Sequence, residues 1–211
     1  MGLPERLPIF PLGIVLYPGE PVPLHIFEPR YREMVRVCQE DDLPFGIVHV
    51  SEEALAEVGC TARIRRVLNH YDDGRLDIVA LGEQRFRIVE IFRDRVYLSA
   101  EVEPFGPERL ERVDASARER VITQHMKLLE MAGETIRPAV YEQARWVSFV
   151  VAQNAGLEIE QKQQLLEMQS ENDRVAYLIQ HFSDLLQRVA RAKRLRALSQ
   201  GDGHATGWPE L

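Results

Sequence analysis

The stretch CTARIRRVLNHYDDGRLDIVALGEQRFRI, residues 60–88, decides the fold. Two segments rich in Val, Ile and Leu flank Asp72-Asp73-Gly74, a sequence typical of a tight β-hairpin turn. Gly82-Glu83 then interrupts the second segment, and in Arg85-Phe86-Arg87-Ile88 arginines alternate with apolar residues, as on a sheet with one solvated face. Together with RVYLSAEVE at 95–103, these segments predict a meander of four consecutive strands.

The residues before this stretch predict short strands and one embedded helix. Prolines at 8, 11, 18, 21 and 23 exclude a helix over residues 7–27 and favour short edge strands. FGIVHV, residues 45–50, predicts a further strand. Pro29 suits the first position of a helix that runs to about Glu40. Helical spacing places four residues on its buried face: Tyr31, Met34, Val35 and Cys38. Short strands around one helix indicate a small β-barrel.

The second half of the chain has a helical pattern. Asp114 begins one predicted helix and Gly133 ends it; Pro138 and Gly156 bound a second; further helices cover 159–168 and the residues from Ser170 onward. We therefore predict an α+β fold, a small β-barrel with an embedded helix followed by a C-terminal helical bundle. The predicted divisions are a barrel at 1–108, a helical part at 109–198 and a flexible tail at 199–211.

Composition and charge restrict the class of protein. The chain has 211 residues and a formal net charge of −7, which argues against a nucleic-acid partner because such domains usually carry a basic face. No apolar run approaches the roughly 20 residues needed to span a bilayer, and the first residues lack the pattern of a secretory signal. Two distant cysteines, Cys38 and Cys60, fit buried thiols in a reducing compartment. We expect a cytoplasmic protein without a membrane partner.

Motifs for catalysis are missing from the sequence. It contains no GxxxxGK[ST] or GxGxxG loop for phosphates, no HExxH metal site and no GxSxG nucleophile turn. His125 lies on an apolar helix face and is interpreted as a core residue. We predict no catalytic residues, no cofactor and no metal site. A small hydrolase that uses a serine, Cys38 or Cys60 is a competing hypothesis.

One charged stretch, PLHIFEPRYREM at 23–34, is a candidate binding surface. The start of the helix at Pro29 accounts for most of its charges. The candidate partner-binding residues lie at this strand-to-helix junction: His25, Phe27, Arg30 and Tyr31.

Four stretches resemble the Lon protease N-terminal domain family, one of them YLSAEVE at 97–103, which is similar to its closing strand. LPIFPLGIVLYPGEPVPLHIFEPRYREMV at 7–35 is similar to its opening signature, residues 60–88 to its hairpin region, and VAQNAGLEIEQKQQLLEMQSENDRVAYLI at 151–179 to its helical part. The resemblance implies a PUA-like barrel and a role in recognising substrates and assembling the protease ring. The ATPase and Ser-Lys peptidase modules of the full protease are not in these 211 residues, so we expect a stand-alone, non-catalytic member.

The leading hypothesis is a module that binds unfolded or flexible polypeptides, with a protease ring as a further candidate partner. A second hypothesis is RNA binding, suggested by the implied PUA-like barrel. It needs five arginines on one basic face: Arg63, Arg65, Arg66, Arg85 and Arg87. The small hydrolase is a third hypothesis, and a scaffold that self-associates or docks on a ring is a fourth. The sequence leaves the oligomeric state open.

Overall fold

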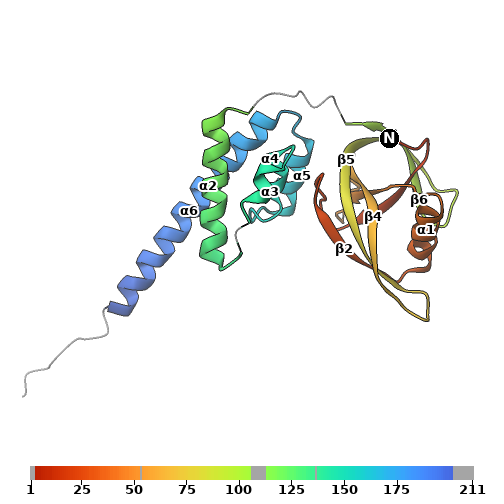
Figure 1. Ribbon diagram of the computed structural model, residues 1–211, viewed down its shortest axis with the longest axis horizontal. Helices are drawn as coiled ribbons and strands as arrows, with labels where there is room; N and C mark the ends of the chain where they lie inside the picture. The colour runs from red at the N-terminus through yellow and green to blue at the C-terminus, as the bar shows by residue number, and fades with distance from the viewer. Residues whose placement is uncertain (1–2, 53, 106–112, 136, 202–211) are drawn as a thin grey trace, which may run out of the picture.

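The computed structural model describes residues 3–52, 54–105, 113–135 and 137–201, and side chains of α6 up to Leu195 except Lys193. Strands and one helix form the first half, and helices form the second (Figure 1). The first half contains β1 Leu7–Leu12, β2 Pro21–Ile26, α1 Pro29–Glu40, β3 Phe45–His49, β4 Val58–His70, β5 Leu76–Phe92 and β6 Leu98–Pro104. The second contains α2 Ala115–Ala132, α3 Ala139–Glu142, α4 Val147–Ala152, α5 Ile159–Glu167 and α6 Glu171–Gly201.

The six strands form one sheet that closes through its longest strand. Their order is β2-β5-β4-β3-β1-β6, and β5 also pairs with β6. The first part of β5 pairs with β2, from Leu76 to Leu81, whereas its last part pairs with β6, from Phe86 to Phe92. β1 and β3 run parallel and all other pairs are antiparallel. The predicted α+β class, a small barrel with an embedded helix followed by helices, is confirmed.

The predicted break at Gly82-Glu83 is wrong, because β5 continues through it as one strand of 17 residues. Gly82 serves close packing instead of a turn. The β1–β2 connection lies against it: the Gly82 amide donates to the Glu20 carbonyl at 2.9 Å, and the Gly19 amide donates to the Gly82 carbonyl at 2.8 Å. A Cβ at Gly82 would collide with the carbonyl oxygen of Tyr17. The meander therefore has three strands, β4, β5 and β6.

The local signals for turns and helix ends are confirmed. Gly74 in the β4–β5 turn has φ +82°, and Gly133 after α2 has φ +75°, both in the left-handed region that favours glycine. The Asp114 carboxylate accepts a hydrogen bond from the amide of Ala117 and caps α2. Helix α1 spans Pro29–Glu40 as predicted. Its buried residues are those that the spacing predicted: Tyr31, Met34, Val35 and Cys38.

The single helix predicted between Pro138 and Gly156 is wrong, because α3 and α4 are separate. Trp146 between them has extended backbone angles, φ −125° and ψ 102°. The amide of Ser148, in the first turn of α4, donates to Oε1 of Glu171 at 3.0 Å. A carboxylate from α6 thus satisfies a free amide at the start of α4, which a sequence pattern confined to residues 138–156 does not show.

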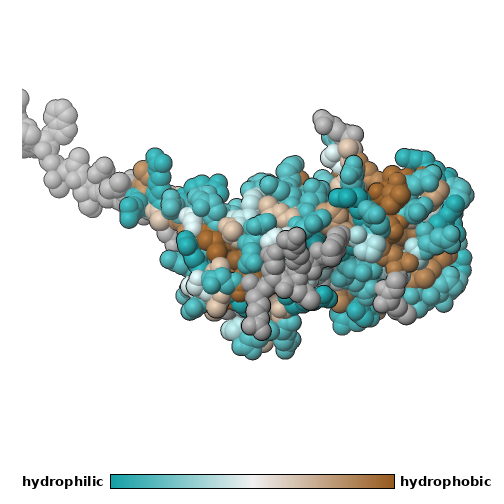
Figure 2. Space-filling model, turned by 90° about the horizontal axis from the view of Figure 1, so that it is seen from above, coloured by the Kyte–Doolittle hydropathy of each residue, from teal (hydrophilic) through white to brown (hydrophobic). Residues whose placement is uncertain are grey.

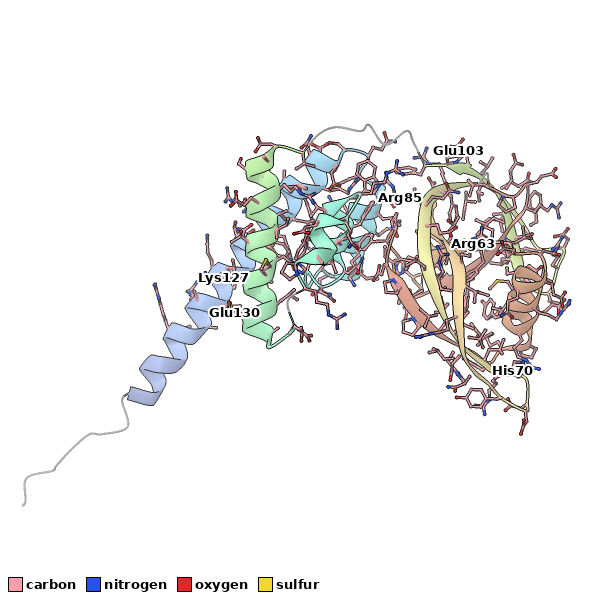
Figure 3. All side chains as sticks on the ribbon, viewed as in Figure 1. Arg63, His70, Arg85, Glu103, Lys127 and Glu130 are labelled. Atoms are coloured by element: carbon pink, nitrogen blue, oxygen red, sulfur yellow. The ribbon has the colours of Figure 1, made fainter. Side chains whose placement is uncertain are left out.

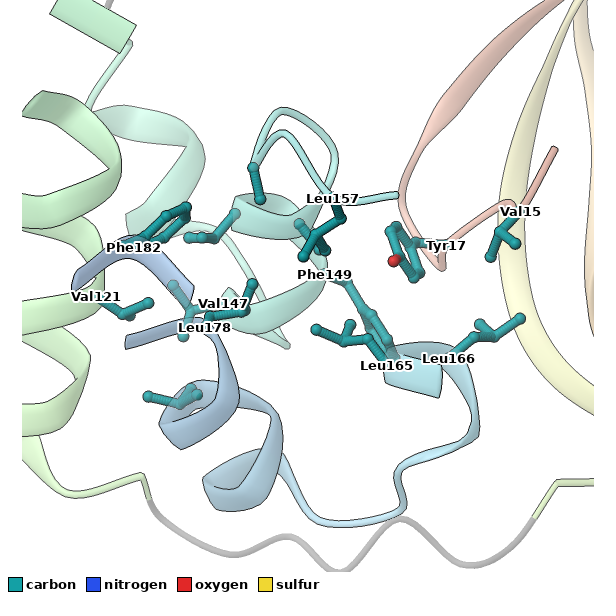
Figure 4. Close-up of a cluster of buried hydrophobic side chains, with 14 of the residues drawn as sticks. Val15, Tyr17, Val121, Val147, Phe149, Leu157, Leu165, Leu166, Leu178 and Phe182 are labelled. Atoms are coloured by element: carbon teal, nitrogen blue, oxygen red, sulfur yellow. The ribbon is translucent and has the colours of Figure 1, made fainter. Parts of the chain in front are cut away.

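A hydrophobic core joins the barrel to the helices (Figure 4). Val15 and Tyr17 from the barrel pack in one cluster with Leu165 and Leu166 from α5. The Tyr17 ring stacks on the Phe149 ring, with centroids 5.4 Å apart. The change from strands to helices lies between Pro104 and Ala115. The predicted boundary at 108/109 lies outside the described residues.

Helix α6 extends beyond its neighbours. It packs against α2 and α4 in its first half and then projects away from them (Figure 1). It runs to Gly201, past the predicted start of the tail at 199, and the remaining residues of the tail, 202–211, lie outside the described ranges. Seen from above, hydrophobic residues show mainly over the barrel, with a smaller area over the helices (Figure 2).

Candidate functional site

The residues predicted to bind a partner lie where β2 ends and α1 begins. His25 is near the end of β2, Phe27 is in the connection, and Arg30 is in the first turn of α1. The Phe27 side chain is 58% exposed, and its ring stacks on the His25 ring with centroids 5.9 Å apart. The structure therefore brings an exposed aromatic side chain and a histidine together at this place.

A polar cluster that sequence reasoning missed holds His25. Its Nδ1 lies 2.6 Å from Oδ1 of Asp77, its cross-strand neighbour on β5. The Nδ2 of Asn69 and the hydroxyl of Tyr71 donate to the other carboxylate oxygen, at 2.8 and 2.7 Å. Hydrogen bonds from Asn69, His25 and Tyr71 lower the pKa of Asp77 to about 2. The cluster is therefore anchored by a carboxylate that stays ionised at neutral pH.

Tyr31 contributes to the barrel core and not to the exposed surface. It is only 7% exposed, and its ring centroid lies 4.2 Å from that of Phe10. The Arg30 guanidinium lies over the outer side of the ring at 4.5 Å and pairs with Glu28 at 2.7 Å. We call His25, Phe27 and Arg30 the junction surface, with Tyr31 beneath it. A binding role for these four residues stays a prediction.

The five arginines required for an RNA-binding face do not lie on one exposed face. Arg85 is 4% exposed and donates to the carbonyl oxygens of Leu166 and Met168, at 2.6 and 2.7 Å. Figure 3 shows it on the side of the barrel nearest the helices, apart from Arg63. Arg63 and Arg65 both approach the carboxylate of Glu83, at 3.2 and 3.5 Å. The predicted basic face is therefore wrong in its composition, since Arg85 is buried, and Arg63 and Arg65 share the carboxylate of Glu83.

The two candidate cysteines and His125 are buried. Burial raises the pKa of the Cys38 thiol to about 12, and it also raises the pKa of Cys60. His125 is buried, and desolvation lowers its pKa to about 4. Within the described ranges, no three His, Cys, Asp or Glu residues gather to hold a metal ion, and no helix is both long and apolar enough to cross a bilayer.

A groove lies between the barrel and the helices, a place that sequence reasoning did not predict. Its larger part has a volume of about 630 Å³ and is bounded by Pro18 and Pro21 on the barrel side and by Val140 and Trp146 on the helical side. An adjoining hollow of about 360 Å³ extends it. The two parts, which we call the groove, share four lining residues: Arg137, Val140, Val150 and Gln153.

The break between α3 and α4 creates the helical side of the groove. Val140 of α3 is 43% exposed and lines it, whereas Tyr141 beside it is buried. On α4, Val150 lines the groove, while Phe149 and Val151 are fully buried in the core. A continuous helix over 138–156, as the sequence pattern predicted, would not form this arrangement. The pattern therefore did not predict the groove.

The barrel side of the groove includes the start of β2, an edge strand. β2 is the first strand in the sheet order and pairs with β5 alone. In an antiparallel pair, the backbone N–H and C=O groups of alternate residues point toward the partner strand. Proline has no N–H to donate, so the residues of β2 whose backbone groups point toward β5 are Val22 and Leu24. The backbone of Pro21 and Pro23 therefore points to the free edge of β2, and this edge lacks two N–H donors. Such an edge resists the addition of another strand.

Comparison with known proteins identifies the family. Residues 6–184 match the family described as the ATP-dependent protease La (LON) substrate-binding domain. The chain belongs to this family. Residues 7–35, 60–88, 97–103 and 151–179, which carried the predicted resemblance, all lie within the matched range.

Proteases that contain this domain are distant relatives in sequence. The chain is 27% identical over 194 residues to the Lon protease of Cytophaga hutchinsonii, a match that covers 84% of this chain and 24% of that protein. It is 26% identical over 209 residues to Lon protease 2 of Syntrophobacter fumaroxidans, covering 92% and 26%. The chain thus spans about a quarter of the length of these relatives.

Solved structures of Lon N-terminal domains share the fold. A Lon N-terminal domain protein from Xanthomonas campestris matches with a TM-score of 0.67 and 28% identity, covering 82% of this chain and 96% of that one. The N-terminal domain of the Mycobacterium avium complex Lon protease matches with a TM-score of 0.62, covering 85% and 99%. The second is 21% identical and supports the fold alone.

Proposed function

We propose that this chain is a non-catalytic module that binds flexible or unfolded polypeptide segments. The observation that carries the proposal is the groove, which joins exposed Val140 of α3 and half-buried Val150 of α4 to Pro18 and Pro21 on the barrel side. Extended chains bind in such clefts by placing apolar side chains against apolar walls. Membership of a family described as a substrate-binding domain supports the same role.

The buried state of the two candidate cysteines supports the non-catalytic part of the proposal. A thiol attacks as a thiolate, and burial raises the pKa of both Cys38 and Cys60 well above neutral pH. Among the described residues, buried His125 has the Tyr141 hydroxyl as its hydrogen-bond partner, at 2.9 Å, and not a cysteine or serine. A hydrolase would need an exposed nucleophile with a base beside it.

The junction surface is proposed as a second contact for the same polypeptide. Phe27 offers an exposed ring held by His25, which is itself fixed by Asp77. Rigid exposed aromatic side chains commonly act as anchors at interfaces. In a protease, a domain with two such contacts would hold a substrate chain near the degrading machinery. A protease ring is therefore proposed as a partner of this chain.

The proposal is tested by fluorescence anisotropy. A labelled, permanently unfolded protein is titrated beside its folded form and a single-stranded RNA. We expect saturable binding of the unfolded chain alone. Val140→Asp, which replaces an exposed apolar side chain on the wall of the groove by a charged one, should weaken binding about tenfold, because the apolar contact is lost and the hydrated carboxylate would have to lose water when a segment covers it.

Matched variants localise the effect. Val96→Asp makes the same change in the β5–β6 connection, where Val96 is 67% exposed and does not line the groove, and should leave binding unchanged. Phe27→Ala reports on the junction surface separately. Binding to RNA alone, or to the folded form as tightly as to the unfolded form, would refute the proposal.

A further inference from the structure

We propose that the groove selects polypeptide segments in which apolar residues are combined with acidic ones, an inference that rests on the polypeptide-binding function proposed above. Three features of the groove support it. The barrel edge lacks backbone N–H donors, the groove wall carries arginines, and the Trp146 ring already has arginine side chains beside it.

The barrel edge gives the backbone of a bound segment little to pair with. Pro21 and Pro23 face outward from β2 and cannot donate hydrogen bonds. A bound segment therefore does not gain a full ladder of main-chain hydrogen bonds there, which would hold any sequence equally well. Recognition consequently depends on the side chains of the segment.

The wall of the groove carries unbalanced positive charge. Arg137 and Arg145 line its larger part, and neither forms an ion pair with a carboxylate of the described residues. Glu83, the one carboxylate on the described part of that wall, is approached by Arg63 at 3.2 Å and by Arg65 at 3.5 Å. Each of the guanidinium groups of Arg137 and Arg145 offers a fork of donors that suits a carboxylate on the bound segment.

Among the described residues, the adjoining hollow adds one carboxylate, that of Glu134, and no further arginine or lysine. Glu134 lines the hollow together with Arg137, which both parts share, and opposes part of the positive charge of that arginine. His125 also lines it, and its pKa of about 4 makes it neutral near pH 7. The positive charge of the groove is therefore greatest near Arg145, in the larger part, which Glu134 does not line.

The Trp146 ring, which lines the larger part of the groove, already has two cations beside it. The Arg145 guanidinium lies 5.3 Å from the centroid of the Trp146 ring, and that of buried Arg174 lies 5.7 Å from it. A lysine or arginine from a bound segment would have to compete with these charges for the ring. The same arrangement that attracts a carboxylate therefore disfavours a basic segment.

Three labelled peptides test the proposal. They share one apolar core and differ only in their flanks, which are Asp and Glu, Ser and Gln, or Lys and Arg. We expect the acidic peptide to bind about fivefold more tightly than the neutral one, and the basic peptide to bind weakest. Raising the salt concentration should shrink the difference, because these charges are exposed to solvent.

Two variants identify the residues responsible. The double variant R137E/R145E should reverse the order of the acidic and basic peptides. Arg93→Glu, an exposed residue of the β5–β6 connection that does not line the groove, should preserve it. Equal affinity for all three peptides, or the same preference in the double variant, would overturn this inference and leave the proposed function standing.

Two further outcomes have separate meanings. If neither the peptides nor the unfolded protein binds, the proposed function itself fails. If a single-stranded RNA binds the groove in place of the acidic peptide, and R137E/R145E abolishes that binding, the inference is wrong about the class of ligand.

Discussion

Nη1 of Arg85 on β5 lies 2.6 Å from the carbonyl oxygen of Leu166 on α5. The same nitrogen donates to the carbonyl of Met168 at 2.7 Å, just past the end of the helix. The guanidinium also lies 5.0 Å from the ring centroid of Phe105. A barrel side chain therefore satisfies carbonyl groups that α5 leaves open at its C-terminus, and its positive charge suits that end of the helix.

Arg85→Met should destabilise the protein markedly. Methionine retains much of the packing but removes the donors, leaving carbonyl groups at the barrel–helix contact without this partner. We expect the free energy of unfolding to fall by about 2–4 kcal/mol, measured by urea denaturation. Arg87→Met is the matched control. Arg87 lies on the same strand but is exposed, and its ion pair with Glu103 is long, at 4.0 Å. A loss below about 1 kcal/mol is expected there, and equal losses would contradict the capping role.

The contrast between Arg85 and Arg87 shows that a strand pattern predicts the face on which a side chain lies, but not whether another element covers that face. Alternation correctly placed both arginines on the face opposite Phe86, which is fully buried inside the barrel. It could not show that α5 covers only one of the two. That cover comes from residues about 80 positions further along the chain, whereas period-two spacing reports only on a single strand.

The successes and failures on the helices follow the same distinction. Pro29 and the spacing of the apolar residues specify α1 locally, and the structure agrees with the predicted limits. The break before α4 depends on Glu171, which caps Ser148 from another helix. Likewise, His25 and Phe27 were recognised by their position, but Asp77, which fixes His25, lies 52 residues away. The groove was missed because it requires the break between α3 and α4.

Gly82→Ala should destabilise the barrel, since the added methyl would meet the backbone of Tyr17 and a backbone cannot move aside as a flexible side chain does. We expect a loss of about 2–4 kcal/mol in the free energy of unfolding. Gly13→Ala provides the comparison, because a Cβ there meets nothing within 4 Å. It should be neutral or slightly stabilising. Thermal unfolding of both variants decides the matter, and a tolerated Gly82→Ala would disprove the close approach.

Glu171→Gln should be among the most harmful single changes in the helical part. The carboxylate accepts from the Ser148 amide at 3.0 Å and pairs with fully buried Arg174 at 2.9 Å. Removing its charge leaves a guanidinium buried without its counter-ion, which typically costs about 3–5 kcal/mol. Glu160→Gln, an exposed change in the first turn of α5, should cost less than about 1 kcal/mol. Calorimetric unfolding that ranks the two alike would count against this account.

His125 should make stability depend on pH between about 4 and 6.5. Burial lowers its pKa to about 4 in the folded state from 6.5 in the unfolded chain, and the ring is enclosed by Tyr141 and Phe182. Between these values the unfolded chain binds the extra proton and the folded protein does not. The contribution of His125 is therefore fully present above pH 6.5 and declines as the pH falls toward 4.

The expected loss over this range is at most about 3 kcal/mol, measured by urea denaturation at several pH values. His125→Gln keeps an acceptor for the Tyr141 hydroxyl and removes the titrating ring, so its stability should change less with pH in this window. His70→Gln alters an exposed histidine at the end of β4 and should keep the dependence of the original protein. Parallel pH profiles for the original protein and H125Q would show that His125 is not the group that titrates.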